Sequence, residues 1–253
     1  MQPGFFDLDS RHQELEKLGD PLPRLAELID WEGFPPLLDR IRKKERKNAS
    51  GRKSYDAVLM IKIFFLQSFY GLGDDQTEYP IHDRYSFCRF LGLAPESKVP
   101  DAKTIWLFRE SLKKAGLINE LFAELDGQIW AVGYRSRKGQ IIDANLIVIP
   151  RQRNSREENA RIKQGETPEN WKENPARLRQ KDIDARRTQK NGENHYGYKN
   201  HISIDNEHKL IRHFEVTSAE VHDNQVFDCL IDEENTSMAV WVDSAYRSRS
   251  IVA

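Results

Sequence analysis

The apolar pattern of this 253-residue chain changes character at Gly139, and that change constrains the fold more than any other feature. Before it, apolar residues recur at helical spacing between glycines, prolines and short polar turns. After it, Gln140–Ile149 is a short run rich in β-branched residues that stops at Pro150, as a strand does. The chain is therefore predicted to be of the α/β class, with a helical N-terminal domain (residues 1–133) followed by a sheet-containing domain (residues 134–253).

Capping residues predict the main helices of the first domain. Ser54 is expected to cap a long apolar helix that ends near Gly71, and Asp101 to cap a second helix that ends at Gly116. The long helix contains three polar side chains and falls short of the roughly 18 apolar residues of a membrane span. It is therefore predicted to be a core helix. The two helices that meet at Gly116 favour an ordinary helical hairpin over a DNA-reading helix-turn-helix.

The second domain is predicted to be a mixed sheet interrupted by a polar segment. Residues 151–194 carry few apolar side chains and are expected to form a mobile insertion with a single helical turn. Alternating residues then predict a hairpin from Tyr196–Asp205 and Lys209–Thr217. Asp223 is expected to cap a helix, and Met238–Asp243 reads as a buried central strand.

Two aspartates, Asp143 and Asp243, interrupt or end these apolar strands, where a carboxylate is costly to bury without a partner. Two carboxylates on neighbouring strands repel each other unless a cation lies between them. Mg²⁺ prefers carboxylate oxygen, and paired ions assist in-line phosphoryl displacement. A strand-end cap explains either aspartate alone, but the pair predicts a catalytic site that binds Mg²⁺ or Mn²⁺ through Asp143 and Asp243.

The net charge of −1 conceals a segregated charge distribution. Eight basic residues and one acidic residue lie between Arg40 and Lys53, whereas residues 205–234 hold nine acidic residues and two basic ones. Such segregation suits a phosphate backbone, although a solvated helix face explains any single run about equally well. The residues predicted to contact DNA are Arg42, Lys43, Lys44, Arg46, Lys47, Arg52, Lys53, Lys199 and Arg247.

Other classes of site are disfavoured by residue spacing. Cys88 and Cys229 lie 141 positions apart and form no CxxC pair, so they are expected to be buried, reduced thiols. The histidines between residues 195 and 222 match no zinc-binding pattern. The N-terminus lacks the basic start and apolar run of a signal peptide, so a cytoplasmic location without membrane contact is expected.

Several stretches carry a recognisable pattern in order along the chain. They are Val99–Arg109, Ile142–Ala144, Tyr196–His201, Val221–Asp223 and Trp241–Arg247, and the opening Gly4–Leu8 fits as well. Together they resemble the DDE transposases of the bacterial insertion-sequence family five. The resemblance implies a helical region that recognises transposon ends, followed by a ribonuclease-H-like catalytic domain. In that fold the first aspartate lies on the first strand and the second follows the fourth strand, which implies Asp143 and Asp243.

Such transposases also need a third carboxylate, a glutamate on a later helix, and residues 244–253 contain no acidic residue. The chain therefore resembles a truncated member with an incomplete sheet domain. The complete form is expected to catalyse Mg²⁺-dependent cleavage and strand transfer at inverted-repeat DNA ends, and this fragment is expected to be inactive. It is expected to pair with a second copy or with a full-length transposase. The alternatives are a DNA-binding remnant that acts as a repressor, and a general metal-dependent nuclease.

Overall fold

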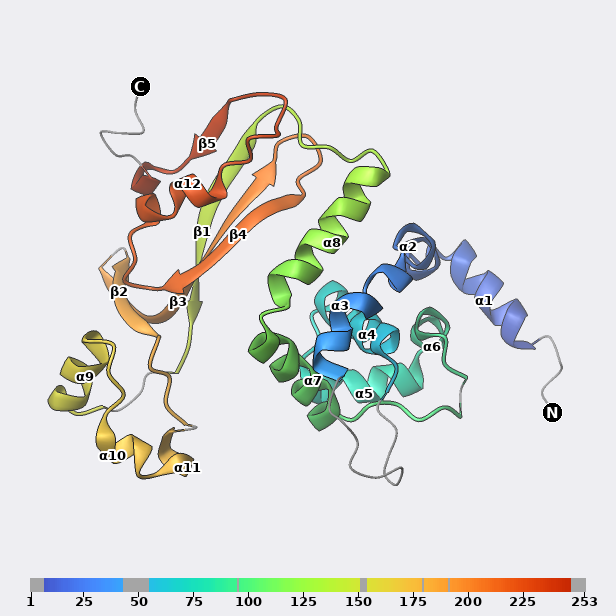
Figure 1. The fold of residues 1–253 in the computed structure, drawn as a ribbon. Coiled ribbons are helices and arrows are strands. Elements are labelled where there is room, and N and C mark those ends of the chain that lie inside the picture. Colours follow the sequence, from blue (N-terminus) through green and yellow to red (C-terminus); the bar gives the residue numbers. More distant parts are fainter. Residues whose placement is uncertain are drawn as a thin grey trace. The chain divides into compact units, whose positions relative to one another are not determined.

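The computed structural model describes residues 7–42, 55–94, 96–150, 154–178, 180–190 and 192–246. The chain divides into two compact units, Met1–Gly133 and Tyr134–Ala253. The first unit is helical, and the second contains a mixed sheet with short helices (Figure 1). The predicted α/β class, with a helical region preceding the sheet, is confirmed.

Helices make up the described part of the first unit. They are α1 (Asp7–Lys17), α2 (Leu22–Leu28), the 3₁₀ helix Trp31–Gly33, α3 (Pro35–Arg42), α4 (Ala57–Tyr70), α5 (Asp74–Asp83), α6 (Tyr85–Leu91), α7 (Ala102–Ala115) and α8 (Ile118–Ala131). Within the described residues no single helix is long and apolar enough to span a membrane. Only α4 and α5 taken together reach that length, and the chain bends by 99° between them.

The core of the first unit forms around α4, whose residues are apolar on nearly every side, as expected of a buried helix. Ile63 and Leu66 are fully buried there. The N-cap of α4 is Asp56, whose carboxylate accepts a hydrogen bond from the backbone N–H of Leu59 at 3.1 Å. The predicted cap at Ser54 is therefore wrong by two residues, because an equally good cap lies closer to the first buried turn.

The helix α7 begins and ends where its sequence predicts. Asp101 accepts a hydrogen bond from the backbone N–H of Thr104 at 2.7 Å, and Gly116 ends the helix in the left-handed conformation. On the same helix, the Arg109 guanidinium donates to Asp74 at 2.5 Å and to Gln67 at 2.8 Å. Arg109 therefore ties α7 to both α4 and α5.

A five-stranded sheet forms the centre of the second unit in its described part. Its strands are β1 (Gln140–Val148), β2 (Arg186–Lys190), β3 (Glu193–Asp205), β4 (Ile211–Ser218) and β5 (Val240–Val242). The long strand β3 pairs antiparallel with β1 along one edge, and with β2 and then β4 along the other. The short strand β5 pairs parallel with β1.

A small core covers one face of this sheet. Ile142 on β1 packs there with Val226, Leu230 and Tyr246, which come from the segments around α12 (Phe227–Leu230) and after β5. The prediction that Asp223 caps this helix is wrong. Asp223 instead opens a separate 3₁₀ helix, Asp223–Gln225, and its side chain points to a partner on β3.

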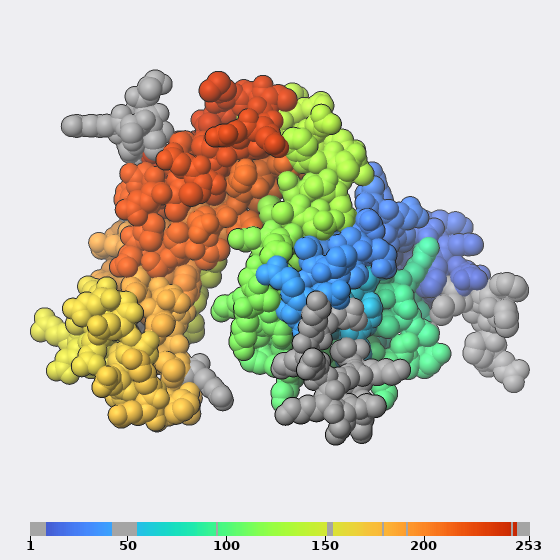
Figure 2. Space-filling model, in the orientation of Figure 1, coloured from blue at the N-terminus to red at the C-terminus, as the bar shows by residue number. Residues whose placement is uncertain are grey.

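The polar insertion contains three helices, α9 (Arg156–Lys163), α10 (Glu169–Lys172) and α11 (Pro175–Leu178), so the prediction of a single helical turn is wrong. They gather beside β2, and Figure 2 shows them in yellow as a compact lobe. The buried carboxylate of Glu158 accepts hydrogen bonds from Trp171, Asn170 and Arg177, at 2.8, 3.0 and 2.8 Å. A satisfied polar centre with one buried tryptophan thus replaces the apolar residues that this segment lacks.

Candidate functional site

The parallel pairing of β1 with β5 brings the two predicted aspartates to neighbouring positions. Gln140 pairs with Val240 and Ile142 with Val242, so Asp143 and Asp243 each follow the last pair. The Oδ1 atom of Asp143 accepts a hydrogen bond from the backbone N–H of Ala144 at 2.7 Å, and that of Asp243 from Ala245 at 2.8 Å. Each carboxylate is thereby oriented by a backbone N–H of its own segment.

The pKa of Tyr246 reflects the negative charge of the carboxylates at this end of the sheet. Burial raises the pKa of its phenol above the ordinary value, and the carboxylates of Asp223, Asp143 and Asp243 raise it further. The tyrosine is fully buried, and its hydroxyl lies 3.3 Å from Nδ1 of His201. The carboxylates of three aspartates therefore lie near enough to this phenol to disfavour its ionisation.

A chain of hydrogen bonds continues from Tyr246 into the sheet. His201 on β3 is fully buried, and its Nε2 lies 2.9 Å from the hydroxyl of Thr217 on β4. Burial lowers the pKa of His201, which favours the neutral ring. A neutral ring donates through one nitrogen and accepts through the other, so it links the two hydroxyls. The turn after Asp243 is thus connected to two strands.

Lys199 anchors a second segment at the same site. Its ammonium group donates to Asp223 Oδ1 and to the carbonyl of Val221, both at 2.7 Å. An ammonium has three donors, so one remains for a ligand. The predicted DNA contact at Lys199 is therefore a group already held in an ion pair at the edge of the site.

These residues line a pocket of about 260 Å³ in the second unit. Its walls come from β1, β2, β3, the segment after β4 and the turn after β5, and include Lys199, Asp223 and Asp243. Asp143 is exposed on the neighbouring strand and is not among the residues that line this pocket. The pocket thus presents one of the two predicted aspartates, with the second beside it.

The donor set suits a divalent cation of the Mg²⁺ type, because carboxylate oxygens are the hard ligands that Mg²⁺ prefers. Among the described residues, however, no group of three or more His, Cys, Asp or Glu side chains is arranged to hold a metal ion. Two carboxylates suffice for an ion that keeps several of its waters. The residues present therefore fit a loosely held, hydrated Mg²⁺.

Most of the predicted DNA-binding residues cannot be placed on the fold. Lys43, Lys44, Arg46, Lys47, Arg52, Lys53 and Arg247 lie outside the described residues. Arg42 is the last residue of α3, and its side chain also lies outside the described part of the chain. Contact of this basic run with DNA stays a prediction.

Three residues of the site were missed as a connected group. His201 and Tyr246 lie within stretches that carried the family resemblance, and Thr217 reads from sequence as an ordinary strand end. Alternation along β3 does indicate that Lys199 and His201 share one face of the sheet. No sequence signal shows that Thr217 and Tyr246 contact that face, because the register of β4 and the turn after β5 decide it.

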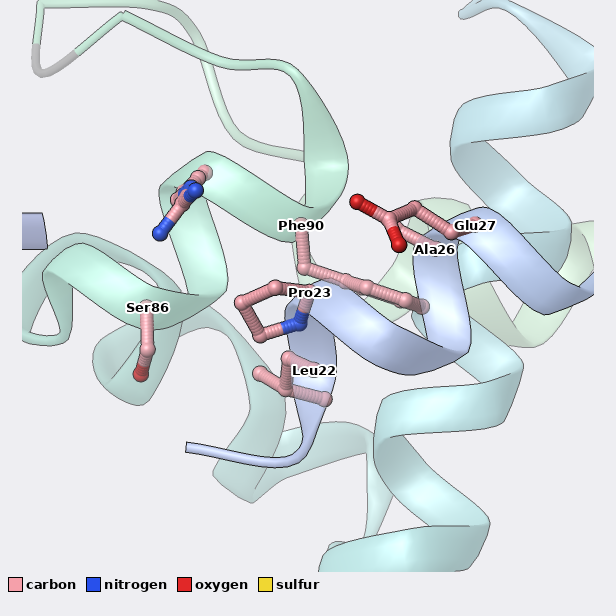
Figure 3. Close-up of a pocket in the computed structure, with 7 residues that line it drawn as sticks. Leu22, Pro23, Ala26, Glu27, Ser86 and Phe90 are labelled. Carbon is pink, nitrogen blue, oxygen red and sulfur yellow. The ribbon is translucent and has the colours of Figure 1, made fainter. Parts of the chain in front are cut away.

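A smaller pocket in the first unit offers less chemistry. It measures about 150 Å³ and lies between α2 and α6, where Leu22, Pro23 and Phe90 meet (Figure 3). Arg89 at its rim is paired with Glu16 at 2.5 Å. This lining is mainly apolar, and its titratable groups are Glu27 and the paired Arg89, so the candidate site is that of the second unit.

The two cysteines take no part in either site. Both are free, and burial raises the pKa of the Cys88 thiol, as expected for an unreactive cysteine. Cys229 is exposed, so the predicted burial of this thiol is wrong.

Comparison with known families agrees with this geometry. Residues 10–111 match a transposase domain (DUF772), and residues 134–253 match a transposase DDE domain. The chain belongs to the DDE transposases, of the type found in insertion-sequence family five. Its function is therefore of the transposase type, in a family that acts on DNA and generally uses a divalent metal. No solved structure matches the chain.

Proposed function

We propose that this chain binds duplex DNA at the inverted-repeat ends of an insertion sequence and holds Mg²⁺, or Mn²⁺, between Asp143 and Asp243. The observation that carries the proposal is the parallel register of β1 and β5, which sets the two aspartates side by side. A bound divalent ion would activate the attacking oxygen and stabilise the leaving oxygen of a phosphodiester. DNA cleavage and strand transfer are the chemistry that such a site serves.

The surrounding residues hold this site in shape. Lys199 positions the segment from Val221 to Asp223 and keeps one N–H for a phosphate oxygen. The Thr217–His201–Tyr246 chain fixes the turn that carries Asp243. These groups orient the carboxylates, and their buried positions keep water from competing for the same hydrogen bonds.

A third carboxylate is the group that these residues do not supply after Asp243, since residues 244–253 are free of acidic side chains. We propose that the 253 residues bind DNA and the metal without cutting DNA unaided. Pairing with a full-length transposase would supply such a carboxylate.

The test compares metal binding and cleavage in one set of variants. Titration calorimetry with Mg²⁺ and Mn²⁺ is expected to show binding that is lost in Asp143→Asn and in Asp243→Asn. Asp228→Asn is the matched control, because Asp228 is exposed on α12 and does not line the pocket. Equal metal binding in all variants would contradict the proposed metal site at Asp143 and Asp243. Metal-dependent nicking of supercoiled DNA by the unmodified chain would contradict the proposal that it does not cut DNA unaided.

A further inference from the structure

A groove runs from the aspartate pocket along β2 toward the insertion. The aspartate pocket shares three lining residues, Thr188, Gln189 and Glu220, with a second pocket of about 370 Å³. The far end of that second pocket carries Lys163 and Arg187. The two pockets therefore adjoin at these residues, and we refer to them together as the groove.

The groove contains paired and unpaired charges. Arg186 lies 3.3 Å from Glu220, and Lys199 lies 2.7 Å from Asp223, so these two pairs largely cancel. Asp243 then provides the negative charge at one end of the groove. The remaining positive charges are exposed: Lys190 lines the aspartate pocket together with Asp243, and Arg187 and Lys163 line the second pocket.

Hydrogen bonds hold the segments that carry these basic residues. Arg186 donates through Nη2 to the carbonyl of Ile162 at 3.1 Å, which joins α9 to β2. Arg187 donates through Nε and Nη2 to Asn194 Oδ1, at 3.1 and 2.6 Å, across the β2–β3 hairpin. Asn194 is neutral, so the bond orients the guanidinium without cancelling its charge. In the described sheet β2 pairs with β3 alone, so its other edge stays open.

We propose that this groove binds the backbone of the DNA strand that carries the reacting phosphate, with Lys163, Arg187 and Lys190 contacting phosphates on one side of it. The inference rests on the proposed function, because the acidic end of the groove is the proposed metal site. A metal-bearing end receives the reacting phosphate, and a row of cations receives its neighbours. The insertion thus contributes a DNA-binding surface of its own, independent of the basic run after α3.

The test measures how the affinity for a short fluorescein-labelled DNA duplex depends on salt, by fluorescence anisotropy. The groove variant is Lys163→Gln with Arg187→Gln and Lys190→Gln. The matched control removes the same charge from the same insertion outside the groove, as Arg156→Gln with Arg161→Gln and Lys172→Gln. Each phosphate contact adds roughly 0.9 to the slope of log affinity against log salt, so the groove variant is expected to lose about 2 to 3.

The outcomes separate this inference from the proposed function. Failure of the unmodified chain to bind the duplex at low salt overturns both. Binding by the unmodified chain with an equal slope in the groove and control variants overturns the groove alone. The same titrations are repeated with poly-glutamate in place of DNA. If the groove variant loses as much salt dependence with poly-glutamate as with DNA, the groove fits an acidic protein segment, and the proposal that it binds DNA is overturned. Arg187→Lys, which keeps the charge, is expected to retain most of the slope, and circular dichroism checks folding.

Discussion

Lys199 and Asp223 form an ion pair across 2.7 Å between β3 and the segment after β4, and their side chains retain only 15% and 14% exposure. The lysine also donates to the carbonyl of Val221, so a single ammonium group holds both ends of that segment. The segment forms one wall of the pocket that contains Asp243. The shape of the candidate site therefore depends on a contact between residues 24 positions apart.

Lys199→Met is expected to destabilise the second unit by about 2 kcal/mol, because it leaves the carboxylate of Asp223 without its charged partner. Asp223→Asn is expected to cost less, since an amide oxygen still accepts from the ammonium. Urea denaturation of both single variants and the double variant measures the coupling between the two side chains. Strictly additive losses would show that the pair contributes nothing to stability.

Protonation of Glu158 at low pH is expected to destabilise the insertion. The backbone N–H of Ser155 and the side chains of Asn170, Trp171 and Arg177 lower the pKa of Glu158 to about 2, below its ordinary value of 4.5. A carboxyl whose pKa is lower in the folded chain stabilises the fold above its ordinary pKa. That contribution is lost as the pH falls from about 4.5 toward about 2.

The indole N–H resonance of Trp171 gives a direct reading of this loss, because that group donates to Glu158 at 2.8 Å. It is expected to shift as the pH falls below the ordinary carboxyl range. Glu158→Gln is expected to abolish the pH dependence and to weaken the insertion at neutral pH. Glu157→Gln, an exposed neighbour in the same helix, serves as the control. A Trp171 signal that moves identically in all three proteins would contradict the role given to Glu158.

The two aspartates stand out in the sequence, whereas their surroundings do not. Each carboxylate interrupts or ends an apolar run, which is visible in the sequence itself, but both are exposed in the structure, so neither bears a cost of burial. Asp223 also looks like a helix cap locally, and only the fold shows that Lys199, 24 residues earlier, is its partner. Local sequence rules describe neighbours along the chain, and this contact depends on strand register.

The insertion shows a different limit. Its composition predicts disorder because composition averages over the whole segment, and most of these side chains are indeed polar. Trp171 is nevertheless fully buried, and Glu158 satisfies several donors around it. One tryptophan and one carboxylate organise the lobe, and an average over residues 151–194 does not reveal two such residues.

Arg109 is expected to stabilise the first unit through the geometry of its guanidinium group as well as through its charge. It contacts Asp74 and Gln67 through two nitrogens, and its guanidinium lies 5.0 Å from the centre of the Phe64 ring. Arg109→Lys keeps the charge but loses the two-pronged geometry, so it is expected to cost about 1 kcal/mol. Arg109→Met is expected to cost more, about 2 kcal/mol, because Asp74 then loses its ion pair. Thermal unfolding compares the two, and an unaffected Arg109→Lys protein would show that charge alone matters.

Gly197 lies where three strands meet, since it pairs with Val148 on β1 and with Arg186 on β2. Its φ of +148° is rarely adopted by residues with a side chain, and a Cβ at this position would lie 2.0 Å from the backbone carbonyl oxygen of Ile147. Backbone cannot move aside cheaply, so the clash adds to the strain.

Gly197→Ala is therefore expected to destabilise the second unit by at least about 3 kcal/mol, through strain and overpacking together. Gly192→Ala is the matched control in the adjoining hairpin, because its φ of +81° is also positive but a Cβ there meets nothing within 4 Å. Strain alone predicts a loss of about 1 kcal/mol for Gly192→Ala. Hydrogen exchange of the β3 amides, followed by mass spectrometry, measures the loss of stability in each of the two variants. Equal losses in the two variants would mean that the contact with Ile147 is relieved by a small shift of β1, and that the close approach of the strands at Gly197 is not required for the sheet.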